Sequence, residues 1–197
     1  LLRNLTYLSL YNNSLTGTIP ASLGQLTALG TLSLRENALT GSIPSALSEL
    51  KALKTLDLSV NEVTGTIPSS IGQLANMLGF RVNHNPLLSG TIPSEIANLR
   101  SLAVAWFHNT SMTGTVPLCS LDKSFTELVA DCLEVNCTCC THCCPSAFNG
   151  TPAFGFCSAA TLPYAQAVVT LINAITLSNQ APGAINMVPG EIILHPG

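Results

Sequence analysis

The chain has 197 residues, a formal net charge of −3, 47% hydrophobic residues and only 9% charged residues. Abundant Leu, Ile and Val exclude a disordered chain, and seven Lys and Arg residues without a basic cluster exclude a dedicated nucleic-acid binder. The longest apolar stretch, at 165–177, is interrupted by Gln, Thr and Asn, so the sequence predicts no membrane span.

A short motif ending in Gly-x-Ile-Pro or Gly-x-Val-Pro recurs through the first 117 residues. Its glycines stand at 17, 41, 65, 90 and 114, so successive copies are 24 or 25 residues apart. A fixed period of this length indicates a repeat architecture, in which one copy cannot bury its own apolar face and copies must stack.

Ahead of each glycine lies a second pattern, Leu-x-x-Leu-x-Leu-x-x-Asn, which begins with Leu5, Leu8, Leu10 and Asn13. It predicts a short strand with alternate residues buried, followed by a turn whose backbone groups the Asn amide satisfies. The fifth copy has Thr110 where Asn is expected. The fourth copy has an extra residue within 85–88, which predicts a small bulge.

These five copies resemble the plant-type leucine-rich repeat of receptor-kinase ectodomains and polygalacturonase-inhibiting proteins. The resemblance implies an α/β solenoid, a curved stack with a parallel inner β-sheet, over residues 1–117. Because Leu1 falls inside a repeat and terminal repeats normally need a cap, we expect the chain to be a fragment or a processed product.

All eight cysteines follow the repeats, within the segment 118–157: Cys119, Cys132, Cys137, Cys139, Cys140, Cys143, Cys144 and Cys157. They suit either a zinc site, with His142, or a disulfide-rich cap on the end of the solenoid. Five glycosylation sequons, at Asn4, Asn12, Asn109, Asn136 and Asn149, indicate a secretory route and favour disulfides, with the pairing open. The segment is similar to the cysteine-rich end of secreted leucine-rich-repeat proteins of diatoms and related algae.

Residues 158–197 form a third segment with a helical apolar spacing over 163–177, then two short strand patterns. We expect a short α/β tail. Its order resembles the opening of a right-handed β-helix; alternatively, the segment extends the cap or contacts another subunit.

The resemblance places the residues between the buried leucines on a concave face. Most are small and polar, and the exceptions are the candidate ligand-binding residues Tyr7, Tyr11, Arg35, Asp57, Arg81, Trp106 and His108. Trp106 suits a binding hot spot or the cover of the last repeat. The charges at 35, 57 and 81 suit a ligand clamp or a solvated row of ion pairs.

No acid pair, nucleophile motif or phosphate loop points to catalysis, and no metal or cofactor site is predicted. The sequence therefore predicts a non-enzymatic extracellular module, secreted or at the cell surface, that recognises a protein or glycan. The alternative is a glycosylated structural subunit that self-assembles into an extracellular fibre or wall.

Overall fold

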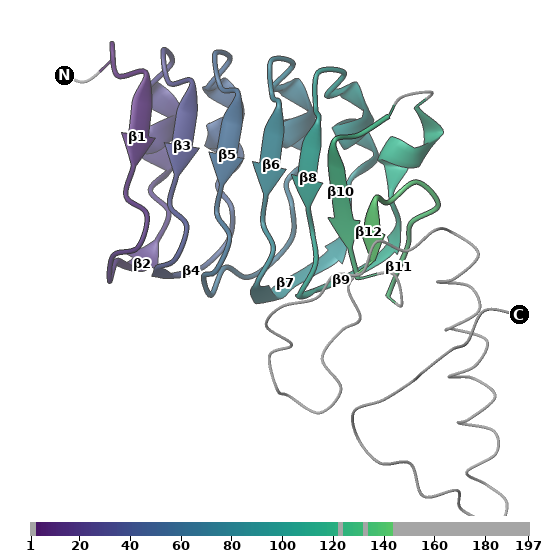
Figure 1. The fold of residues 1–197 in the computed structure, drawn as a ribbon. Helices are drawn as coiled ribbons and strands as arrows, with labels where there is room; N and C mark the ends of the chain where they lie inside the picture. The colour runs from purple at the N-terminus through teal and green to yellow at the C-terminus, as the bar shows by residue number, and fades with distance from the viewer. Residues whose placement is uncertain (1–2, 122–123, 132–133, 144–197) are drawn as a thin grey trace, which may run out of the picture.

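The computed structural model describes residues 3–121, 124–131 and 134–143 of the chain. Its central feature is a seven-stranded parallel sheet, the inner sheet, in which strands lie side by side along the stack (Figure 1). In spatial order the strands are β1 (Tyr7–Ser9), β3 (Thr31–Ser33), β5 (Thr55–Asp57), β6 (Gly79–Arg81), β8 (Val104–Trp106), β10 (Glu127–Ala130) and β12 (His142–Cys143).

The register keeps each repeat position beside its equivalent in the next copy. Leu8 pairs with Leu32, Leu56 with Phe80, and Ala105 with Leu128. From Leu32 onward these side chains are fully buried. The alternation of a strand thus sends one apolar column into the core and leaves the flanking residues on the inner face.

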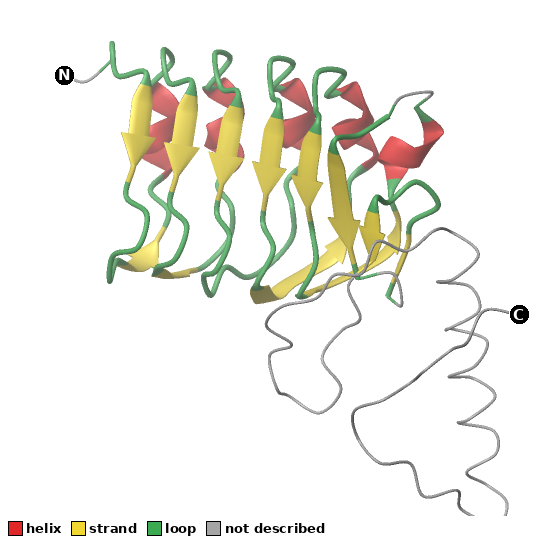
Figure 2. Ribbon diagram, in the orientation of Figure 1, coloured by secondary structure: helices red, strands yellow, loops and turns green. Residues whose placement is uncertain are grey.

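The return segments are short 3-10 helices on the opposite side of the stack (Figure 2). They are η1 (Ala21–Gln25), η2 (Ser45–Glu49), η3 (Ser69–Gln73), η4 (Ser94–Asn98) and η5 (Pro117–Ser120). An extended proline precedes each of the first four, since its fixed φ suits the start of a helical turn. These helices pack so closely that a Cβ on Gly24 would clash with the carbonyl of Ala46.

A second layer of short strands lies along one edge of the stack. The glycine motif and the residues just before it form β2 (Thr16–Thr18) with β4 (Ala38–Thr40), and β7 (Asn85–Thr91) with β9 (Thr110–Thr115), to which β11 (Val135–Asn136) of the cysteine segment adds. All five motif glycines have positive φ, which explains why a side chain is avoided there. The predicted bulge in the fourth copy is confirmed by a register shift between Asn85 and Ser89.

The cysteine segment continues the solenoid instead of only closing it. Strands β10 and β12 extend the inner sheet beyond residue 117, the predicted end of the repeats. The division into 1–117, 118–157 and 158–197 stays a prediction, and the tail at 158–197 lies outside the described residues.

The described cysteines are disulfide-bonded, and none of them is free. Cys119 pairs with Cys139, and Cys137 with Cys140. The Sγ atoms of Cys119, Cys137 and Cys139 lie within 4.8 Å of one another, a spacing that also suits a metal, but the pairing favours the disulfide alternative. Cys132, Cys144 and Cys157 lie outside the described residues.

The predicted α/β solenoid with a parallel inner sheet and a disulfide-bonded C-terminal end is therefore confirmed. Within the described residues, none of the helices has the length and hydrophobicity needed to cross a bilayer.

Candidate functional site on the inner face

The inner face carries three rows of side chains that run across the strands. The first row contains Tyr7, Thr31, Thr55, Gly79, Val104 and Glu127. The second contains Ser9, Ser33, Asp57, Arg81, Trp106 and Val129. The third follows the strand ends and contains Tyr11, Arg35, Ser59, Asn83, His108 and Asp131. All seven predicted binding residues lie in these rows, and their role as a site stays a prediction.

The first repeats present exposed aromatic side chains. Tyr7 is 64% exposed and Tyr11 is 50% exposed. The guanidinium carbon of Arg35 lies 5.7 Å from the Tyr11 ring centroid, and Arg35 Nη2 forms an ion pair of 2.7 Å with Glu36. This end therefore offers aromatic surface beside a guanidinium, a combination common in binding hot spots.

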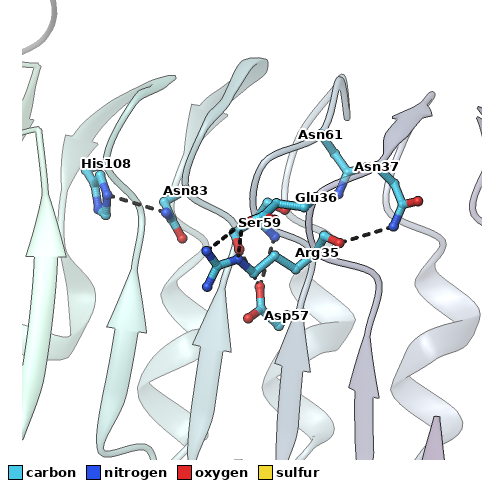
Figure 3. Close-up of polar contacts among 8 residues, drawn as sticks. All are labelled: Arg35, Glu36, Asn37, Asp57, Ser59, Asn61, Asn83 and His108. Carbon is cyan, nitrogen blue, oxygen red and sulfur yellow. Dashed lines mark hydrogen bonds and ion pairs between the residues drawn. The ribbon is translucent and has the colours of Figure 1, made fainter. Parts of the chain in front are cut away.

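In the middle of the face Arg35 pairs with Glu36, and Asp57 is hydrogen-bonded to Ser59 (Figure 3). These contacts differ from a row of ion pairs between Arg35 and Asp57. Asp57 is buried and accepts hydrogen bonds from the backbone N–H and the hydroxyl of Ser59, at 3.1 and 2.6 Å. The turn two residues on thus fixes the orientation of this carboxylate through Oδ1.

Trp106 joins the fifth repeat to the next strand. Its indole Nε1 donates to Glu127 Oε2 in β10 at 2.9 Å, while the guanidinium of Arg81 lies 4.8 Å from the ring centroid. Both sequence interpretations of Trp106 have support: it contacts the junction with the cysteine segment, and it remains partly exposed on the inner face.

A cluster of titratable and amide side chains lies at the third-row end of these strands. The rings of His84 and His108 meet edge to face with centroids 5.1 Å apart, and Asn109 Nδ2 lies 2.6 Å from His84 Nδ1. Burial, followed by the charge of His84, lowers the pKa of His108 to about 4. Burial, followed by the charge of Arg35, also lowers the pKa of His84.

Burial shifts the pKa of Asp131 in the opposite direction. Burial raises its carboxyl pKa to about 6, against the backbone N–H groups of Asn109 and Thr110, which lower it. Its Oδ2 accepts from Thr110 N at 3.2 Å. Asp131 thus connects the end of strand β10 to the turn of the fifth repeat.

A ladder of asparagines fixes the turns beneath the third row. Asn61 is typical: its amide donates to the carbonyls of Leu34, Leu58 and Ser59, and its oxygen accepts from Leu39 N. Asn37 and Asn85 repeat this arrangement. The function expected for the recurring Asn from the sequence pattern is confirmed.

Comparison with known proteins agrees with this architecture. The family model described as leucine rich repeat matches residues 3–63. The crystal structure of the BIR3–SERK2 complex from Arabidopsis thaliana has 32% sequence identity over 74% of this chain and 74% of that chain, with a TM-score of 0.56. The chain belongs to the leucine-rich-repeat family.

Two further leucine-rich-repeat structures are similar. The BIR2 ectodomain from Arabidopsis thaliana has 34% identity over 57% of this chain, with a TM-score of 0.55, and the PEPR1–AtPEP1 structure has 32% identity over 65%, with a TM-score of 0.59. This chain spans 59% of the BIR2 chain and 19% of the PEPR1 chain. No curated protein matches the sequence of this chain. The predicted resemblance to plant receptor ectodomains is confirmed.

The sequons of this leucine-rich-repeat chain differ in accessibility. Asn4, Asn12 and Asn136 are exposed. Asn109 is partly buried and bonded to His84. Asn149 lies outside the described residues.

The sequence pattern does not predict three inner-face residues, because strand β10 lacks the leucine-rich-repeat consensus. Glu127, Val129 and Asp131 flank Leu128 and Ala130, which occupy the buried positions of the pattern. The alternation of Leu128 and Ala130 with the other three residues is the sequence signal that indicates a strand here.

Proposed function

We propose that this chain is a non-enzymatic extracellular module that binds a protein ligand through the inner face of its leucine-rich repeats. The observation that carries the proposal is the pair of exposed tyrosines, Tyr7 and Tyr11, with the guanidinium of Arg35 over the Tyr11 ring. Tyrosine and arginine provide large contact area with polar ends and are enriched at interface hot spots. The small residues on strands β3, β5 and β6 leave the face open to a ligand that spans several repeats.

Three observations support an extracellular location. The cysteine segment is disulfide-bonded, and disulfides persist in oxidising compartments. Three sequons are exposed, so we infer N-glycans at Asn4, Asn12 and Asn136. The similar structures include an ectodomain, BIR2, and a complex, BIR3–SERK2, which supports a protein partner over a glycan. The fibre alternative stays a prediction from sequence.

The test compares two triple variants of the 197-residue chain against each protein ligand obtained from a screen of secreted proteins. The inner-face variant carries Tyr11→Ala, Arg81→Ala and Trp106→Ala. We expect its affinity in surface plasmon resonance to fall at least roughly thirtyfold, because truncating even one hot-spot side chain typically costs about 2 kcal/mol. The matched control carries Gln25→Ala, Glu49→Ala and Glu95→Ala, all exposed on the 3-10 helices of the opposite side.

The control variant keeps the wild-type affinity if the inner face is the site. Circular dichroism confirms that both variants are folded. Unchanged affinity of the folded inner-face variant would overturn the proposal.

A further inference from the structure

Three neighbouring side chains of the third row leave polar atoms unsatisfied. Within the described residues, the buried side-chain nitrogen and oxygen atoms without a hydrogen-bond partner are Asn83 Oδ1, His108 Nδ1 and Asp131 Oδ1. Asn83 is only 5% exposed and Asp131 only 2%. Buried polar atoms are normally paired, so three orphans on consecutive strands of one row indicate a place where a ligand completes the bonding.

The existing contacts define what this cluster offers. Asn83 Nδ2 lies 3.4 Å from His108 Nε2 (Figure 3). An amide nitrogen only donates, so Nε2 accepts and the proton of the neutral ring resides on Nδ1. Neutrality agrees with the lowered pKa of His108, about 4. The cluster therefore presents two oxygen acceptors, from Asn83 and Asp131, on either side of one N–H donor.

The surrounding charge selects a cation. The six inner strands from β1 to β10, with the turn residues that follow them, contain the carboxylates of Glu36, Asp57, Glu127, Asp131 and Glu134 against the guanidinium groups of Arg35 and Arg81. Arg35 forms an ion pair with Glu36, and Arg81 stacks on Trp106. The Asp131 oxygen that lacks a partner thus lies in a net negative region.

The cluster supplies one imidazole and one carboxylate, fewer than the three protein ligands of a typical zinc centre. A ligand with several separated hydrogen-bonding atoms suits the row instead.

We propose that Asn83, His108 and Asp131 form a subsite for a lysine or arginine residue of a polypeptide ligand. The basic group donates to Asp131 Oδ1, a backbone N–H of the ligand donates to Asn83 Oδ1, and a backbone carbonyl of the ligand accepts from His108 Nδ1. Because the three atoms are buried, the proposal includes a rotation of the partly exposed His108 side chain that opens a path to them. This subsite rests on the proposed function, because it lies on the same inner face.

The probe is N-acetyl-arginine methylamide, and its neutral isostere is N-acetyl-citrulline methylamide. Trp106 is the only tryptophan of the chain and lies 6.2 Å from His108 between ring centroids, so its fluorescence reports on the site. We expect saturable binding of the arginine probe at about millimolar concentration and roughly tenfold weaker binding of the citrulline probe. Asp131→Asn, which keeps an acceptor for Thr110, weakens the arginine probe roughly tenfold, whereas Glu95→Gln on the opposite side changes nothing.

Equal binding of the two probes, no saturable signal, or an unchanged affinity of Asp131→Asn would each overturn the subsite. Those outcomes leave the proposed function standing if the inner-face triple variant still loses its protein ligand. Asn83→Leu gives a second measurement if Asp131→Asn does not fold, and we expect it to weaken the arginine probe severalfold.

Discussion

His108 and Asp131 occupy adjacent positions of the third row, and burial moves their pKa values in opposite directions. The carboxyl pKa of Asp131 is raised from 3.8 to about 6, while the imidazole pKa of His108 is lowered from 6.5 to about 4. Each group therefore stays neutral in the folded protein over a pH range in which it is charged in the unfolded chain. The two groups have opposite effects on stability between about pH 4 and 6.

The direction of each pH effect follows from how many protons the folded and the unfolded state bind. As pH rises from about 4 to 6, unfolded Asp131 loses its proton before folded Asp131 does, so the free energy of unfolding falls. Over the same range unfolded His108 keeps a proton that the folded state does not bind, so the free energy of unfolding rises with pH. Lowering of the His84 pKa adds to the effect of His108.

Asp131→Asn isolates the histidine contribution. We expect its free energy of unfolding to rise more steeply than that of the wild type between about pH 4 and 6, by up to about 3 kcal/mol, because the opposing carboxyl is gone. Urea unfolding at several pH values measures this difference.

His108→Gln is the reciprocal control, and its free energy of unfolding should fall with pH relative to the wild type. Parallel pH profiles for wild type and Asp131→Asn would contradict the buried carboxyl as the source.

At the scale of the elements, the asparagine ladder explains why three-residue strands persist as one sheet. Each ladder amide bonds within its own turn and to the preceding copy, so it joins consecutive coils as well as ending a strand. Its effect on stability should depend on burial. Asn61 is only 6% exposed and makes four hydrogen bonds, whereas Asn13 in the first repeat is exposed and donates two.

Asn61→Ala leaves the Leu39 N–H without its partner in the core, whereas the carbonyls of Leu34, Leu58 and Ser59 keep hydrogen bonds from Asn37 Nδ2, Asn85 Nδ2 and Glu36 N. We expect it to lower the free energy of unfolding by about 2 kcal/mol, since one buried backbone group left unsatisfied costs about 1–3 kcal/mol. Asn13→Ala should cost less than about 1 kcal/mol, because water replaces the amide. Urea denaturation of both variants checks this, and equal losses would show that the ladder does not act through burial.

The ladder and the bulge in β7 could be predicted because both follow from spacing along the sequence. The pairing of Arg35 with Glu36 could not, because Glu36 takes the left-handed conformation, φ 54°, and no local pattern says where its carboxylate then lies. Asp57 was likewise assigned to the charged row, although Ser59 two residues on supplies its hydrogen bonds.

At the scale of the whole molecule, strand β10 joins the repeats to the cysteine segment. It was not predicted because Thr110 replaces the ladder Asn and the segment 127–131 lacks the leucine pattern, yet Leu128 and Ala130 are fully buried and pair in register. Tertiary pairing here overrides a weak local signal. The cap is thus built on a continuous sheet, and the two disulfides whose cysteines both lie within the described residues, Cys119–Cys139 and Cys137–Cys140, differ in span.

The two disulfides should contribute unequally to stability. Cys119–Cys139 joins residues 20 apart and ties η5 to the segment after β11, whereas Cys137–Cys140 joins residues 3 apart. Chain entropy predicts that losing the longer loop costs about 3 kcal/mol and the shorter one about 1.5 kcal/mol. The measurement is urea unfolding of the paired variants Cys119→Ser with Cys139→Ser and Cys137→Ser with Cys140→Ser, after non-reducing mass analysis has confirmed that the remaining disulfides are formed. If the shorter loop cost as much as the longer one, the cap would be stabilised by its packing against β10 and not by restriction of the unfolded chain.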